Sequence, residues 1–99
     1  MRLVTLNLTF KQTEATDPIR AYAEEKIVPT IQKFAHHDTE AHMVLKVEKL
    51  RHLAEISFHV DGHDFACHSE SDDMYTSIDR LNSTLAEQLR RHKDKLTRH

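Results

Sequence analysis

The last ten residues, 90–99, are the part of the chain whose side chains are best suited to binding chemistry. They carry five Lys or Arg residues and one acid, although the whole chain of 99 residues has a formal net charge of −2. Without this segment, nine Lys or Arg residues remain against fifteen Asp or Glu residues. Clustered cations neutralise phosphates and release counterions, and their local field attracts polyanions. The segment therefore points to nucleic acid binding.

Nine histidines raise the possibility of a metal site. The segment 59–64, His-Val-Asp-Gly-His-Asp, concentrates potential ligands, and His36 and His37 form another cluster. Zinc needs three or four ligands that converge tetrahedrally. Asp-Gly is a strong signal for a two-residue hairpin turn, and such a turn places His59 and His63 on opposite faces of the strand pair. We therefore expect no resident metal and no cofactor.

Catalysis is the weakest interpretation of the chain. Cys67 is expected to point into the core, where a thiol behaves as an inert hydrophobe. His68, Ser69 and Glu70 are neighbours on a predicted strand, so their side chains alternate in direction and cannot form a proton relay. The single glycine, Gly62, excludes a glycine-rich phosphate loop. We do not expect an enzyme.

The hydrophobic pattern predicts six elements. Alternating apolar residues predict strands over 3–10 and 43–47, and an Asp-Gly hairpin over 56–67 that pairs Val60 with His63, Phe58 with Phe65 and Ile56 with Cys67. Thr16 or Asp17 followed by Pro18 predicts the start of a helix, which Pro29 should bend or break near residues 25–29. A second helix is expected over residues 73–97, with Ser71 or Asp72 as its N-cap.

A strand-helix-strand start favours a right-handed parallel pairing of the first two strands, and the later strands should follow as an antiparallel meander. Both helices must cover the same apolar face of the sheet. The expected fold is α+β, a two-layer βαβββα sandwich with a four-stranded mixed sheet. Residues 1–99 should form a single domain.

Four segments together carry a family resemblance across nearly the whole chain: residues 43–49 with His52, residues 59–62, residues 73–79, and residues 88–96. In order and spacing the chain resembles the short ribosome hibernation promoting factors of the ribosome-associated inhibitor family, also called the sigma-54 modulation proteins. The resemblance implies a fold like that of double-stranded-RNA-binding domains. It also implies binding to the small ribosomal subunit in the mRNA and tRNA channel, inhibition of translation, and promotion of inactive ribosome dimers in stationary phase or under stress.

The resemblance also implies the partners. They are the rRNA and neighbouring ribosomal proteins of the small subunit, together with a ribosome modulation factor, and we expect neither a membrane nor DNA as a partner. Because the chain ends at His99, we expect neither the extended tail nor the second domain of longer relatives, and therefore no self-dimerisation of the long-form kind. One cysteine and the lack of a signal-peptide pattern indicate a cytoplasmic protein.

The candidate RNA-binding residues fall into three groups. The second helix should supply a basic ridge opposite its apolar stripe, the second strand a further patch, and the first helix two cations where the family carries basic residues. The candidates are Arg20, Lys26, Lys46, Lys49, Arg80, Arg90, Arg91, Lys93, Lys95 and Arg98. Two alternatives remain open: that bases at a helix C-terminus only complement the helix dipole, and that the chain is a protein-interaction module whose acidic surface meets a basic partner such as a transcription or sigma factor.

Overall fold

Six elements succeed one another in the order β-α-β-β-β-α. The computed structural model describes residues 3–60 and 62–97, with the side chains of the last helix described as far as His92. The elements are β1 (Val4–Lys11), α1 (Asp17–Phe34), β2 (Thr39–Glu48), β3 (Arg51–Val60), β4 (His63–Ser71) and α2 (Met74–Thr97). This is the expected βαβββα order.

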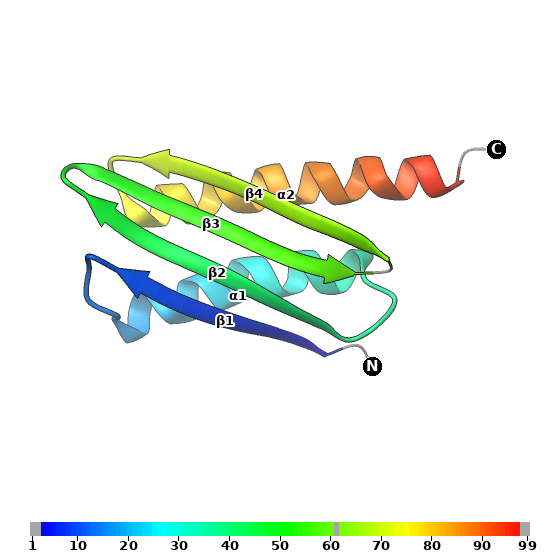
Figure 1. Ribbon diagram of the computed structural model, residues 1–99, viewed down its shortest axis with the longest axis horizontal. Coiled ribbons are helices and arrows are strands. Elements are labelled where there is room, and N and C mark those ends of the chain that lie inside the picture. Colours follow the sequence, from blue (N-terminus) through cyan, green and yellow to red (C-terminus); the bar gives the residue numbers. More distant parts are fainter. Residues whose placement is uncertain (1–2, 61, 98–99) are drawn as a thin grey trace.

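The four strands form one sheet in the order β1-β2-β3-β4. β1 runs parallel to β2, and the other neighbours pair antiparallel. Figure 1 shows both helices behind the same face of the sheet, where they pack against each other, while the opposite face stays open. The expected two-layer α+β sandwich is confirmed.

The tight hairpin between β3 and β4 has the expected register. Gly62 has φ +82°, a conformation that suits glycine because it has no Cβ. The observed pairs are Val60 with His63, Phe58 with Phe65, and Ile56 with Cys67. The rings of Phe58 and Phe65 stack with centroids 5.3 Å apart. This apolar contact joins the two strands of the hairpin on the face of the sheet that the helices cover.

The core lies between the sheet and the helices. Alternate residues of β2 and β3 point toward the helices and are buried, among them Met43, Leu45 and Ile56. From α2, the residues Met74, Ile78, Leu81, Leu85 and Leu89 are buried at helical spacing. Burying each large aliphatic side chain stabilises the fold by about 1.5–3 kcal/mol. The apolar stripe predicted for the second helix is confirmed.

α1 is continuous through Pro29. Of the predicted bend or break near residues 25–29, the break is therefore wrong. The helix begins as expected, because the Thr16 side chain accepts a hydrogen bond from the Ile19 N–H at 3.4 Å and Pro18 lies in the first turn. Pro29 is exposed, whereas Ile27 and Ile31 on either side of it are fully buried. Tertiary packing of these flanking residues outweighs the local cost of proline, about 3 kcal/mol in a helix interior.

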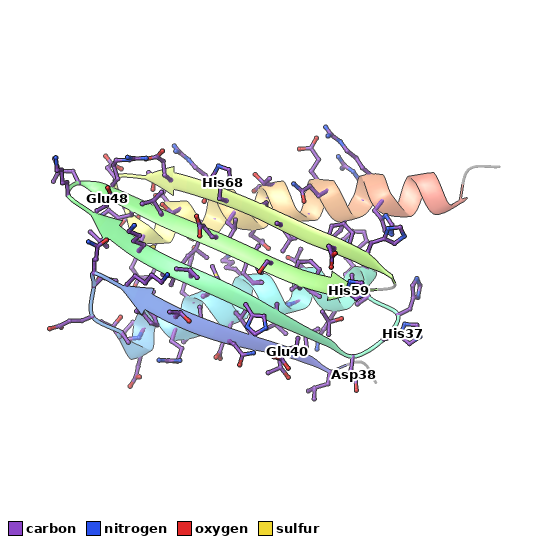
Figure 2. All side chains as sticks on the ribbon, in the orientation of Figure 1. His37, Asp38, Glu40, Glu48, His59 and His68 are labelled. Atoms are coloured by element: carbon purple, nitrogen blue, oxygen red, sulfur yellow. The ribbon has the colours of Figure 1, made fainter. Side chains whose placement is uncertain are left out.

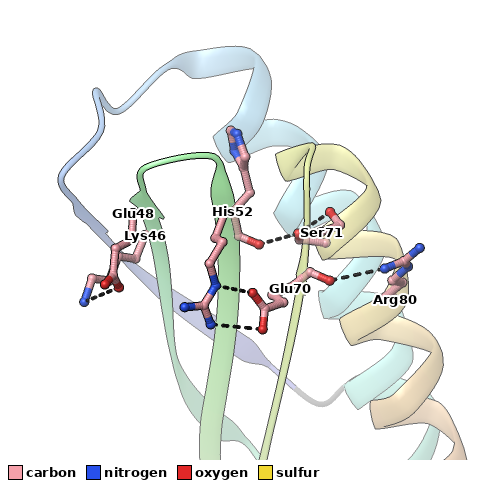
Figure 3. Close-up of polar contacts among 8 residues, drawn as sticks. Lys46, Glu48, His52, Glu70, Ser71 and Arg80 are labelled. Carbon is pink, nitrogen blue, oxygen red and sulfur yellow. Dashed lines mark hydrogen bonds and ion pairs between the residues drawn. The ribbon is translucent and has the colours of Figure 1, made fainter.

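α2 is capped by Asp73 and not by Ser71 or Asp72. The Asp73 carboxylate accepts hydrogen bonds from the N–H of Thr76 at 3.0 Å and from the Thr76 hydroxyl at 3.1 Å. Ser71 instead contacts the hydroxyl of the buried Ser77, which donates to the His52 carbonyl at 2.7 Å. These polar contacts, seen in Figure 3, fix the first turn of α2 against β3 and β4.

Candidate nucleic-acid interface

The C-terminal half of α2 carries the cations best placed for a polyanion. Arg90 and Arg91 are both exposed, while Leu89 beside them is buried against the core. The last turns of the helix extend beyond the β3–β4 hairpin, as Figure 1 shows. The predicted ligands Lys93, Lys95 and Arg98 have side chains outside the described residues, and their roles stay predictions.

Arg80 and Arg91 lie on the same side of α2, because eleven residues at about 100° each bring them within about 20°. Both guanidinium groups already have an internal partner. Arg91 Nη2 lies 2.6 Å from Glu87 Oε1, one helical turn away. Arg80 Nη1 donates to the carbonyl oxygen of Glu70 at 3.2 Å (Figure 3). Arg80 remains a full charge because its partner is a neutral carbonyl, whereas the charge of Arg91 is partly offset by Glu87.

A groove between the two helices adds a cation that the sequence interpretation missed. Lys33 of α1 and Arg90 of α2 line this groove together with Ser83 and Glu87. Lys33 is seven residues after the predicted candidate Lys26, so both occupy nearly the same face of α1. That spacing was visible in the sequence. The approach of Lys33 to Arg90 was not, because it depends on how the helices pack.

Nearer the other end of the helix pair, polar side chains tie α1 to α2. The Tyr22 hydroxyl donates to Asp79 Oδ1 at 2.6 Å, and this hydrogen bond raises the pKa of Tyr22 above its ordinary value. Lys26 Nζ lies 5.5 Å from the centre of the Tyr22 ring, which in turn meets the Tyr75 ring edge-on at 4.9 Å. Lys26 therefore lies on the helical side of the molecule with Lys33 and Arg90. Tyr75, 38% exposed, is an aromatic surface beside it.

Arg20 does not join this surface. Its guanidinium lies 5.5 Å from the centre of the Phe10 ring, at the end of β1. Six residues separate Arg20 from Lys26, which places the two about 120° apart around α1. Arg20 and Lys26 therefore face different sides of α1, and the RNA-binding role of each stays a prediction.

Lys46 and Lys49 lie away from both helices. Lys46 is on the open face of the sheet, with Nζ 3.5 Å from Glu48 Oε2 (Figure 3). Lys49 is in the β2–β3 turn at φ +57°, and its neighbour Leu50 is 85% exposed. The RNA-binding role of Lys46 and Lys49 stays a prediction.

The open face carries charges of both signs. Figure 2 labels Glu40, Glu48, His59 and His68 on it. Its main cation other than Lys46 is Arg51, which binds Glu70 through two hydrogen bonds, one of them 3.1 Å from Nη2 to Oε1. This pairing raises the pKa of Arg51 and lowers the pKa of Glu70. Arg51 therefore has an acidic partner within the chain, as Lys46 has in Glu48.

The histidines of the hairpin separate as expected. His59 is on the open face, with Nδ1 2.7 Å from Asp64 Oδ1. His63 is on the helix side, where its ring lies 4.2 Å from that of His92, and His92 also meets Phe65 edge-on at 5.2 Å. Within residues 3–60 and 62–97, no three His, Cys, Asp or Glu side chains gather in a way that could hold a metal ion.

Cys67 is buried opposite Ile56, as predicted. Burial raises the pKa of its thiol to about 11, because the surroundings disfavour the thiolate. Ser69 donates to the backbone carbonyl of Ser77 at 2.6 Å and so serves the packing of α2. Neither the Cys67 thiol nor the Ser69 hydroxyl is therefore arranged as a nucleophile.

The fold and this surface define a class of protein. It is a small α+β domain that presents cations on its paired helices. Its described part holds no helix long and apolar enough to cross a membrane. A domain of this class is suited to binding an anionic partner.

Comparison with known proteins identifies the family. Residues 6–97 match the family described as sigma 54 modulation protein / S30EA ribosomal protein, and the chain belongs to this family of non-enzymatic ribosome hibernation factors. It is 37% identical over 94 residues to the ribosome hibernation promoting factor of Salmonella typhimurium, covering 95% of this chain and 98% of that one. The corresponding protein of Escherichia coli K12 is 36% identical over 94 residues, which again cover 95% of this chain and 98% of that one.

Solved structures agree on the fold. The N-terminal domain of Protein Y from Thermus thermophilus superposes with a TM-score of 0.76 at 28% identity, covering 93% of this chain and 99% of that chain. A ribosomal subunit interface protein from Coxiella burnetii gives a TM-score of 0.78 at 24% identity, with 91% and 98% covered. The similarity to the Coxiella burnetii protein supports the fold alone.

Proposed function

We propose that this chain is a ribosome hibernation factor that binds the small ribosomal subunit in the mRNA and tRNA channel. It inhibits translation by excluding both ligands sterically, and residues 1–99 act as one binding domain. The observation that carries the proposal is the exposure of Arg90 and Arg91 on α2, just before its last turns, in a chain of this family. A cytoplasmic location and a role in forming inactive ribosome dimers belong to the same proposal, as does a modulation factor as second partner.

The contact is made mainly with the rRNA backbone. Structured RNA presents phosphates and 2′-hydroxyl groups across a shallow groove, and long cationic side chains on a rigid helix reach these groups without reading bases. Arg90, Lys33 and Lys26 offer a second row of charge along the helix pair. Arg80 adds a charge that is held in place through the Glu70 carbonyl.

Co-sedimentation with purified small subunits tests the proposal. The test variant reverses four charges together, R90E, R91E, K93E and K95E. The matched control exchanges the same residues conservatively, R90K, R91K, K93R and K95R, so it keeps the charge while changing the shape.

We expect the wild-type chain and the control to pellet with the subunits and the reversed variant to stay in the supernatant. Circular dichroism should show all three folded, because the substituted positions avoid the buried stripe of α2. Equal pelleting of the reversed variant would exclude the end of α2 as the anchor. Pelleting that is unchanged when mRNA and tRNA are added in excess would exclude the channel as the site.

A further inference from the structure

The free edge of the sheet at β1 presents unpaired backbone groups. Among the described residues, β1 pairs with β2 alone. Leu3, just before β1, directs both its carbonyl and its N–H toward the start of β2. The carbonyl accepts a hydrogen bond from the Thr39 N–H at 2.9 Å, and the N–H donates to Asp38 Oδ1 at 2.8 Å. Successive strand residues turn these groups to opposite sides. The backbone N–H and carbonyl groups that point away from β2, toward the free edge, therefore belong to Val4, Leu6, Leu8 and Phe10.

This edge has little protection against further pairing, and what it has lies at one end, where the Arg20 guanidinium lies 5.5 Å from the centre of the Phe10 ring. β1 is eight residues long, with no proline and a single charge at its last residue, Lys11. The other edge strand differs: β4 carries Asp64 and Glu70, and its Glu70 carbonyl is covered by Arg80. Proteins commonly blunt sheet edges with charge, proline or a covering side chain. The chain does so at β4 and leaves β1 open.

A groove lies along the open edge, between β1 and α1. Its lining combines the apolar side chains of Val4, Leu6, Ala21 and Val28 with Thr5 and two exposed acids, Glu24 and Glu25, which form an acidic rim. Leu6 and Val28 are only half-buried, so an added strand would cover them. Glu24 and Glu25 are exposed, and no hydrogen bond or ion pair with another described residue engages their carboxylates.

We propose that the β1 edge binds an extended basic peptide segment of another protein as a fifth strand. The backbone of the segment would pair with the outward groups of β1. Its apolar side chains would enter the groove, and the long stems of Arg or Lys would lie over Leu6 while their heads reach Glu24 and Glu25. The acidic rim selects a cationic partner by charge complementarity.

The same rim argues against a second copy of this chain as the occupant. Two β1 strands paired edge to edge would bring the two grooves together, and with them the Glu24 and Glu25 carboxylates of both copies. Like charges in one groove oppose association.

The proposal does not depend on RNA binding, because the groove lies on the side of α1 away from α2 and the helical cations.

Titration of the ¹⁵N-labelled full chain with a synthetic peptide tests the proposal. The peptide Thr-Val-Thr-Arg-Thr-Val-Thr-Arg places Val and Arg on one face of a strand and Thr on the other. Two control peptides carry Glu in place of Arg, or N-methyl groups on alternate amides. The matched protein variants are E24K/E25K, which reverses the rim, and E14K, an exposed acid outside the groove.

We expect saturable shifts and slowed hydrogen exchange at the amides of Val4, Leu6, Leu8 and Phe10. E24K/E25K should weaken binding about tenfold and E14K less than about twofold, given ordinary values for exposed ion pairs. Neither control peptide should bind, and E24K/E25K should still bind small subunits.

Four outcomes would overturn the proposal. They are no shift at about 1 mM peptide, shifts centred on β4 or α2, equal binding by E24K/E25K, and binding by the N-methylated peptide. Shifts at β1 that depend on protein concentration without any peptide would assign the edge to a second copy instead.

Discussion

Removing the charge of Glu87 should tighten RNA binding, although Glu87 is itself no candidate RNA ligand. Its Oε1 lies 2.6 Å from Arg91 Nη2, and by helical geometry Glu87 sits between Arg80 and Arg91 on the outer side of α2. The carboxylate therefore competes with phosphate for Arg91 and repels RNA from the helix. In Glu87→Gln the amide keeps the shape of the side chain and loses the charge.

The size of the effect depends on the exposure of the pair. Both side chains are solvent-accessible, 71% for Arg91 and 49% for Glu87. An exposed ion pair of this kind is worth about 0.2–1 kcal/mol, which corresponds to an affinity gain of roughly 1.5–5-fold when Arg91 is released to the RNA. The same pair stabilises the helix by about 0.3–0.5 kcal/mol, so the variant should be slightly less stable.

Fluorescence anisotropy with a labelled small-subunit rRNA fragment measures the affinity, and urea unfolding measures the stability. Glu14→Gln is the matched control, since it removes one exposed acid that lies between β1 and α1, outside α2, and should change the affinity little. If Glu87→Gln weakened binding while Glu14→Gln did not, the ion pair would be orienting Arg91 for its ligand. The account of Glu87 as a competitor would then be refuted.

Three further predictions concern the fold that positions the surface. Ser77→Ala should destabilise the protein by about 1–3 kcal/mol in urea unfolding, because the His52 carbonyl loses its buried donor; an unchanged midpoint would show that this contact is dispensable. Cys67 should resist iodoacetamide at pH 8 in the native protein and react after unfolding, because burial raises its pKa to about 11; rapid native alkylation would contradict this. The pairing of Glu70 with Arg51 contributes stability above the ordinary carboxyl pKa of about 4.5 that is lost as pH falls through the lowered folded value. Glu70→Gln should therefore show a smaller loss of stability on acidification than the wild-type chain, and parallel acid curves would exclude the pair as a contributor.

The sequence predicted the elements with strong local signals. The Asp-Gly turn dictates the register of β3 and β4, because a two-residue loop leaves only one alignment that keeps Phe58 and Phe65 on the same face. The 3.6-residue spacing of Ile78, Leu81 and Leu85 identified α2 and its buried side. Where tertiary packing competes with local propensity, the prediction failed, as at Pro29.

The candidate site was only partly predictable for the same reason. Periodicity placed Arg80 and Arg91 on one side of α2, but it does not report that Glu87 and the Glu70 carbonyl already engage them. Lys33 was missed because its neighbour, Arg90, comes from another helix. The choice of capping residue at α2 depended on Ser71 being held by Ser77, a contact that forms only when the start of α2 packs against the end of β4.

The most direct test of the central claim is the salt dependence of binding to isolated small subunits, measured as the dissociation constant between about 50 and 200 mM potassium chloride. If four or five cations of α2 neutralise phosphates, the wild-type affinity should fall by about 10²-fold over this range, and the R90E/R91E/K93E/K95E variant should lose most of that slope. A wild-type affinity that hardly changes with salt, or an equal slope in the variant, would contradict the account.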